Sequence, residues 1–282
     1  AITTGRASGG PLIQPDRIGM TLPMDQRLFL RDLLNWGRTT SNAIEYVQER
    51  GYMNNAAPVA ELATKPESDL TFEMKSAPVA TIAHWIKASK QVLADAPMLQ
   101  SYINGRLMYG LKLKEEQQLL KGSGVGLNLN GIYTQATAYA NPGVAVLVET
   151  PIDRLRLAML QVALSEFDTD GIVLNPIDWA GIELSKTTDN AYLFASPTGQ
   201  VAPTLWGRPV VATQAMTDKD FLVGAFRMGA QGWDREDANI EVSTEDGSNF
   251  VQNALTIRCE ERVGLTVFRP TAFVRGSLTI TP

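Results

Sequence analysis

The chain has 282 residues, of which 44% are hydrophobic and 20% charged, and its 25 basic and 30 acidic side chains give a net charge of −5. This composition predicts one or two domains with a sizeable core and excludes a chain that is disordered throughout. The acidic balance, without a long basic block, argues against tight direct binding of nucleic acid. The single cysteine, Cys259, excludes an internal disulfide and a cysteine-rich zinc site, and it suits a reducing compartment.

Residues 1–26 contain glycine, proline, serine and threonine without a sustained period, which predicts an extended arm that has no core of its own. The opening AITTGRASGGPLIQP lacks the basic start and apolar block of a secretory signal, and no apolar run approaches the length of a membrane span. We therefore expect a soluble protein. The alanine at residue 1 is compatible with loss of an initiator methionine, an artificial start or cleavage of a longer precursor.

Residues 45–80 are expected to form a long two-stranded projection. Alternating apolar residues in AIEYVQERGYM and LTFEMKSAPVATIAHWI predict the strands, and NNAAPVAELATKPESD between them is rich in turn formers. A ribbon of two strands is too thin to be stable unless it leans on another surface. Lys65 lies on the returning side directly before Pro66, where a lysine is most often a solvated turn cation.

A long helix is expected between Asp95, a predicted N-cap, and Gly122, which follows its last turn. Apolar residues recur at helical spacing across about seven turns. Four charged residues are expected on its exposed surface: Lys112, Lys114, Glu115 and Glu116. The helix would form a spine for the molecule.

Residues 122–226 alternate between predicted helices and strands, which indicates a mixed α/β domain. Thr150 caps the helix PIDRLRLAMLQVALSEF, GIVLNP is a short buried strand, and a second helix starts near Asp178. The runs AYLFAS, GRPVVAT and FLVGAF have the composition of buried strands. From GWDRED onward the sequence is mostly strand-like.

The residues offer little conventional active-site chemistry. His84 is the only histidine, so a histidine-dependent hydrolase is disfavoured, although its proximity to Cys259 stays open. No cluster of ligands has metal-binding spacing, and KGSGVGLNLNG lacks the preceding strand and the GK[ST] ending of a phosphate loop. Asn253 and Glu260 lie seven positions apart in NFVQNALTIRCEER, where a flat strand would place them on opposite faces.

Several long stretches resemble the major capsid proteins of tailed double-stranded DNA bacteriophages: GRTTSNAIEYV, KPESDLTF, TIAHWIKASKQVLADAPMLQSYINGRLMYGLKLKEE, GIVLNPIDW, WGRPVV, NFVQNALTI, CEER and RPTAF. They are colinear from residue 38 to residue 274. The resemblance implies an α+β protein with the phage major capsid fold of the Hong Kong 97 type. The implied parts are an N-terminal arm (1–26), an E-loop hairpin (45–80), a P-domain with the spine helix (27–44, 81–121 and 227–262) and a mixed α/β A-domain (122–226 and 263–282).

The same resemblance implies that the chain is a structural protein of the virion. Members of that capsid family assemble in the host cytoplasm as hexamers and pentamers that close an icosahedral shell around double-stranded DNA. Implied partners are copies of itself, a portal protein and a maturation protease whose cleavage would leave Ala1 as the first residue. No cofactor, metal, membrane or sequence-specific DNA binding is implied.

Subunits of the member that typifies the fold are joined by isopeptide bonds, and three residues of this chain match its crosslinking residues. The lysine corresponds to Lys65, the asparagine to Asn253, and the assisting glutamate, the implied catalytic base, to Glu260. Residues that enclose the lysine correspond to Val59, Glu236 and Arg258, of which the last two are charged here and apolar in that relative. A charged Glu236 beside Lys65 would favour the ammonium and oppose the reaction.

Three alternatives remain open at this stage. One is the same shell held together without covalent bonds, with Lys65 as an ordinary turn residue. Another is a cellular nanocompartment shell of the encapsulin kind, which encloses an enzyme cargo instead of DNA. The last is a soluble metabolic enzyme.

Overall fold

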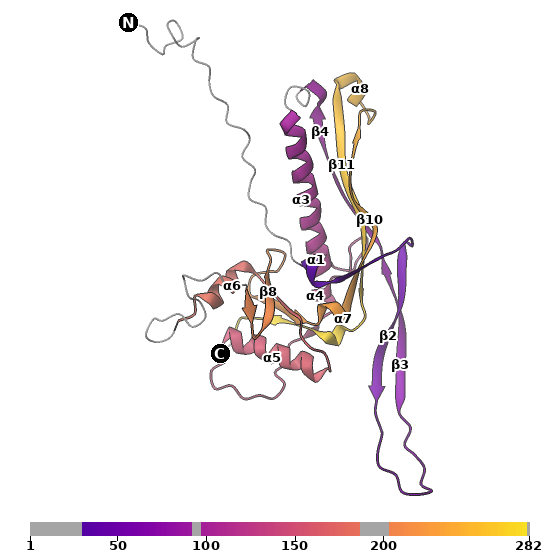
Figure 1. Cartoon of the computed structure of the whole chain (residues 1–282), viewed down its shortest axis with the longest axis vertical. Coiled ribbons are helices and arrows are strands. Elements are labelled where there is room, and N and C mark those ends of the chain that lie inside the picture. The colour runs from indigo at the N-terminus through magenta and orange to yellow at the C-terminus, as the bar shows by residue number, and fades with distance from the viewer. Residues whose placement is uncertain (1–29, 92–96, 187–202, 281–282) are drawn as a thin grey trace.

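The computed structural model of the chain describes residues 30–91, 97–186 and 203–280 (Figure 1). Three sequence predictions lie outside these residues: the N-terminal arm of residues 1–26, the N-cap at Asp95 and the strand at AYLFAS. The described residues form an elongated molecule. A long helix and a narrow sheet rise from a compact lower part, and a thin hairpin extends from the middle in the opposite direction (Figure 1).

The upper part is a four-stranded sheet with the long helix α3 (Pro97–Lys121) beside it. Its strands, in spatial order, are β1 (Asn35–Arg38), β10 (Ala230–Ser243), β11 (Ala254–Val267) and β4 (Ala80–Ser89). β1 pairs with β10 in parallel, and the other neighbours are antiparallel. At 1.5 Å per residue the 25 residues of α3 span about 37 Å, so the predicted spine helix is confirmed.

Every second side chain in the middle of β11 is buried against α3 and holds the sheet to this helix. Ile257 and Cys259 are fully buried and pack with Leu107 and Leu111 of α3. Arg258 between them points to the other face, since neighbouring side chains of a strand alternate. His84 on β4 adds a polar contact, with its Nε2 2.8 Å from the carbonyl oxygen of Leu107.

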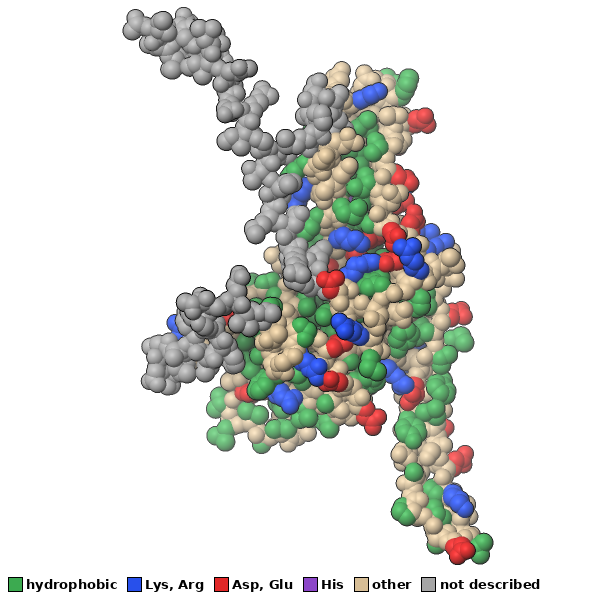
Figure 2. All heavy atoms as spheres, viewed as in Figure 1, with side chains coloured by type: hydrophobic (Ala, Val, Ile, Leu, Met, Phe, Trp, Pro, Cys, Tyr) green, Lys and Arg blue, Asp and Glu red, His purple; other side chains and the backbone are tan. Residues whose placement is uncertain are grey.

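The hairpin consists of β2 (Ala43–Met53) and β3 (Asp69–Pro78), which pair only with each other. Residues 54–68 connect them at the far end. This confirms a two-stranded projection, whereas β4, which follows β3 after Val79, belongs to the other sheet. Large apolar side chains stand exposed along the ribbon among acidic ones (Figure 2): Val47, Tyr52, Met53, Leu70, Phe72 and Met74.

The lower part is a six-stranded mixed sheet in the order β5-β12-β9-β6-β8-β7. Its strands are β5 (Thr137–Ala138), β12 (Phe273–Ser277), β9 (Asp220–Gly224), β6 (Gly171–Leu174), β8 (Arg208–Ala212) and β7 (Thr204–Leu205). On one face α5 (Pro151–Leu164) packs against Ile172, Leu174 and Phe221. On the other face Val173 and Leu222 join a core that contains Leu119 and Leu120 of α3, so both parts of the molecule share buried contacts.

The helix caps of this part follow the sequence closely. The Thr150 side chain accepts a hydrogen bond from the backbone N–H of Asp153, and the backbone N–H of Thr150 donates to the Asp153 carboxylate, which makes a capping box with Pro151 in the first turn. The next helix, α6 (Pro176–Glu183), begins two residues before the predicted Asp178, because the side chain of Asn175 caps it. The predicted strands at GIVLNP, GRPVVAT and FLVGAF are confirmed as β6, β8 and β9.

Short helical turns complete the described chain: α1 (Leu30–Leu33), α4 (Ile132–Gln135), α7 (Phe226–Gly229), α8 (Asn249–Gln252) and the 3₁₀ turn η2 (Pro270–Ala272). α8 lies at the upper end of the narrow sheet, where β10 passes into β11 (Figure 1).

Candidate functional site

Lys65 lies in the loop at the free end of the hairpin and is exposed to solvent. Local contacts shape this loop: the side-chain amide of Asn55 donates to the carbonyl of Glu67 at 2.7 Å, and its backbone N–H donates to Ser68 Oγ at 3.1 Å. Val59 is half-buried in the same loop. The lysine therefore stands exposed in a loop whose base these contacts close.

The base of the hairpin is fixed to the body of the chain by polar contacts. Gln48 donates through Nε2 to the carbonyl of Val267 at 3.1 Å, and Arg269 pairs with Glu49 at 2.5 Å. The ring of Tyr46 meets that of Phe268 edge to face at 5.6 Å. These contacts set the direction in which the ribbon leaves the body.

Asn253 lies at the opposite end of the molecule, where it ends α8 (Figure 1). Its backbone is in the left-handed region, with φ of 50°, a conformation that asparagine tolerates better than most residues. Its carbonyl accepts a hydrogen bond from the N–H of Lys90 at 2.9 Å, and the residue is exposed. It precedes β11, so a left-handed turn separates it from the strand that carries Glu260.

Glu260 is in β11 on the face turned away from α3, and its side chain is 23% exposed. Arg258, two residues earlier on the same face, contacts it at 3.1 Å and pairs with Glu241 of β10 at 2.6 Å. Seven residues of strand separate Glu260 from Asn253, roughly 23 Å at the usual rise. The two side chains cannot meet within one chain.

Glu236 is exposed on β10 and stands opposite Arg262 of β11, at a place where the register shifts on either side. Asn239, not Glu236, is the partner of Glu260 across the strands. Of the residues singled out from the sequence, the structure therefore brings Glu260 and Arg258 together. Lys65 with Val59, and Asn253, lie at the two far ends of the molecule.

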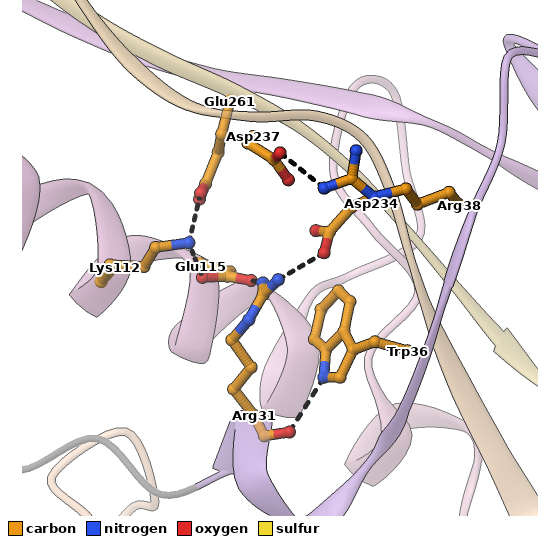
Figure 3. Close-up of polar contacts among 8 residues, drawn as sticks. All are labelled: Arg31, Trp36, Arg38, Lys112, Glu115, Asp234, Asp237 and Glu261. Carbon is orange, nitrogen blue, oxygen red and sulfur yellow. Dashed lines mark hydrogen bonds and ion pairs between the residues drawn. The ribbon is translucent and has the colours of Figure 1, made fainter.

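A buried charge cluster, which sequence reasoning missed, joins α1 and α3 to the sheet (Figure 3). Arg31 contacts Glu115 and Asp234, and Lys112 Nζ lies 2.9 Å from Glu115 and 2.7 Å from Glu261. Glu115 and Glu261 are 2% and 1% exposed. Burial, and then the neighbouring Glu115, raises the pKa of Glu261 to about 7.

The prediction that Glu115 and Glu116 are on the exposed surface of α3 is wrong for both residues. They are 2% and 3% exposed, whereas Lys114 is exposed as expected. The reason is that this turn of α3 packs against the sheet and α1, where polar partners from α1 meet both carboxylates: Arg31 pairs with Glu115, and the backbone N–H of Leu30 donates to Glu116. Two adjacent glutamates next to lysines were the only available signal, and such a run is usually solvated.

His84 and Cys259 are directly opposite each other on β4 and β11, which answers the question of their proximity. Cys259 is fully buried, so no substrate can reach its thiol, and burial raises the pKa of that thiol above its usual value. The imidazole is engaged with the backbone of α3. The pair belongs to the packing between sheet and helix.

Within the described residues, no helix is long and apolar enough to cross a membrane, and no group of three or more His, Cys, Asp and Glu side chains could hold a metal ion.

The two-sheet architecture with a spine helix and a projecting hairpin can be compared with known proteins. A sequence profile described as the phage capsid family matches residues 9–278. The chain belongs to this family and, as a major capsid protein, is a component of the phage virion. It is 53% identical to the major capsid protein of Enterobacteria phage HK97 over 273 residues, which cover 96% of this chain and 71% of that protein.

Solved structures show the same fold at much lower identity. A capsid chain of a native GTA particle superposes with a TM-score of 0.77 at 17% identity, and 99% of each chain is covered. A chain from Mycobacterium phage Cain gives a TM-score of 0.76 at 15% identity, again with 99% of each chain covered. The predicted α+β fold of the Hong Kong 97 type is confirmed. Membership of a phage capsid family also decides against a soluble enzyme.

Proposed function

We propose that the shell formed by this capsid protein is covalently stabilised by isopeptide bonds between Lys65 of one subunit and Asn253 of another, with Glu260 of a further subunit as general base. The observation that carries the proposal is the placement of these residues. Lys65 and Asn253 are both exposed at opposite ends of an elongated chain, and Glu260 lies far from either. Only neighbouring subunits can complete such a site.

The proposed organisation is that of the resembling family: hexamers and pentamers closing an icosahedral shell around double-stranded DNA, with a portal protein and a maturation protease as partners. The parts proposed are the arm (1–26), E-loop (45–80), P-domain (27–44, 81–121 and 227–262) and A-domain (122–226 and 263–282). The hairpin supports this organisation because it exposes apolar side chains and pairs with no other described strand. Contact with a neighbouring subunit would cover them.

The chemistry needs a neutral amine. From an ordinary lysine pKa of about 10.4, losing the proton at neutral pH costs roughly 4 to 5 kcal/mol. The Lys65 nitrogen then attacks Cγ of Asn253, the new C–N bond forms and the bond from Cγ to Nδ2 breaks. Glu260 accepts a proton from the attacking nitrogen and supplies one to the leaving ammonia. Assembly orients the groups, so the reaction proceeds without a cofactor.

Denaturing gels of assembled particles test this proposal. Wild-type shells are expected to give ladders or material too large to enter the gel. Mass spectrometry should find the Lys65 and Asn253 peptides joined with the loss of one ammonia. Lys65→Arg and Asn253→Ala should return monomer bands, because a protonated guanidinium cannot attack an amide and alanine has no side-chain carbonyl to be attacked.

Lys75→Arg is the matched control, since Lys75 is on the same hairpin, where it pairs with Glu73, and this variant should still form ladders. A clean monomer band from mature wild-type shells would leave the non-covalent shell as the function. Particles that contain an enzyme cargo and no DNA would instead support a nanocompartment.

A further inference from the structure

The face of the sheet that carries Glu260 also holds a hollow beside Arg258. Arg258 is directly opposite Trp85 of β4, and the indole is 61% exposed on this face because its neighbour His84 turns toward α3. A cavity of about 490 Å³ opens there. It is lined by Trp85, Glu241, Val242, Ser243, Asp246, Thr256 and Arg258. A side chain arriving on this face would meet an apolar wall next to charged groups.

Arg258 stands between two carboxylates. Its Nη2 lies 2.6 Å from Glu241 and 3.1 Å from Glu260, and its side chain is 48% exposed. The three residues come from adjacent strands that hold them in register: Glu241 pairs across with Arg258, and Glu260 is two positions further along the same face of β11. One guanidinium thus neutralises part of the field of both acids.

Further charged groups surround this pair. Lys87 of β4 stands opposite Thr256, Arg262 is the next residue of β11 on this face, and Asp246 accepts a hydrogen bond from Thr256 at 2.9 Å. Glu236 lies across from Arg262. Arg258 is the cation in contact with the proposed base.

Without a cation between them, the carboxylates of Glu241 and Glu260 would attract the incoming ammonium group of Lys65 and keep it protonated. A nearby negative charge stabilises the protonated lysine, and a nearby positive charge favours the neutral amine. The resemblance leads us to expect an apolar side chain at position 258. The positive charge of Arg258 found there instead would favour the neutral amine of Lys65.

We propose that Arg258, held by Glu241 against Glu260, is a positioning residue that keeps the incoming Lys65 as a neutral amine on this face beside Trp85. The inference rests on the proposed crosslinking and assigns the source of the lysine's activation. Arg258 holds the carboxylate of Glu260 in place and cancels the attraction that Glu241 would exert on an ammonium. The proton released by Lys65 goes to Glu260 and from there to the departing ammonia, while Arg258 itself stays protonated.

The rate of crosslinking in assembled particles, followed on denaturing gels across a pH series, tests the assignment. For Arg258→Gln we expect the pH of half-maximal rate to rise by about one unit and the rate at neutral pH to fall about tenfold. Arg258→Lys, which preserves the charge, should bring the midpoint back toward that of the wild type. Glu241→Gln should shift it downward, because one of the two acids is removed.

Arg38→Gln is the matched control, since Arg38 is ion-paired with Asp237 on the same sheet and its side chain is 81% exposed. It should leave the midpoint where it is. If the pH of half-maximal crosslinking rate is unchanged in Arg258→Gln, this inference alone is overturned. If that variant does not assemble, an unchanged pH in Glu241→Gln overturns it in the same way. Wild-type particles that never crosslink overturn the proposed function and this inference with it.

Discussion

The buried charge cluster at the junction of α3 and the sheet makes the stability of the subunit depend on pH. With every group ionised, the contacts hold three carboxylates, Glu115, Asp234 and Glu261, against the two cations Arg31 and Lys112. Protonation of one acid balances the cluster. Glu261 is the acid whose pKa is raised, from 4.5 to about 7, and its Oε1 is buried without a hydrogen-bond donor.

The raised pKa of Glu261 makes the folded chain less stable as the pH rises. Because the pKa of Glu261 is higher in the folded than in the unfolded chain, the folded state binds the proton more tightly. Its contribution to stability is complete below pH 4.5 and is lost as the pH rises toward 7. A difference of 2.5 units, 7 minus 4.5, corresponds to about 3 kcal/mol at 1.36 kcal/mol per unit.

Glu261→Gln is neutral at every pH and nearly the same in shape, so it should remove this dependence. In urea unfolding of unassembled subunits, followed by tryptophan fluorescence, the free energy of unfolding of the wild type should fall relative to the variant by about 3 kcal/mol between about pH 4 and about pH 9. Glu236→Gln, an exposed glutamate of β10, should show no comparable trend. A difference between wild type and Glu261→Gln that stays flat with pH would refute the reasoning.

Gly224→Ala should lower the free energy of unfolding by about 1 to 3 kcal/mol, because the added Cβ would lie 2.4 Å from Cδ1 of Phe273 and 2.7 Å from the carbonyl oxygen of Ala272. Gly181→Ala in α6, where the added Cβ meets open space, should raise the free energy of unfolding by up to about 1 kcal/mol. Equal effects of the two changes in urea titrations would contradict this difference in packing. Cys259 should resist maleimide labelling until the chain unfolds, because it is fully buried. A cysteine introduced in place of exposed Ser243 should react at once. If mass spectra show both cysteines labelled at the same rate, the sheet and α3 separate readily and the packing argument fails.

Local sequence signals predicted most of the elements of this fold. Helical spacing located α3, spacing together with the Thr150 cap located α5, and alternation with turn residues located the hairpin and the buried strands β6, β8 and β9. The pairing of β1 with β10 was not predictable in this way, because residues almost 200 positions apart meet there. Glu115 and Glu116 were assigned to the wrong surface for the same reason: their partners come from distant segments.

The candidate site was accessible to sequence reasoning only through resemblance. Lys65 has the appearance of an ordinary turn lysine, and Asn253 and Glu260 have that of surface polarity, since each lies apart from the others in the chain. The left-handed turn that takes Asn253 out of β11 leaves no clear sequence signal. The contact between Arg258 and both acids depends on the register of β10 with β11, which is shifted between Asp234 and Asn239.

The hairpin also has a consequence for the time before assembly. A two-stranded ribbon has two open edges, and each is a template on which another strand can add, so free subunits risk aggregation before they assemble. Charged residues interrupt its apolar ones: Glu49, Arg50, Glu73 and Lys75. Such charges slow wrong edge-to-edge association, while Phe72 and Met74 stay available to a fitting surface. The ribbon is thus a compromise between solubility in the newly made subunit and adhesion in the finished particle.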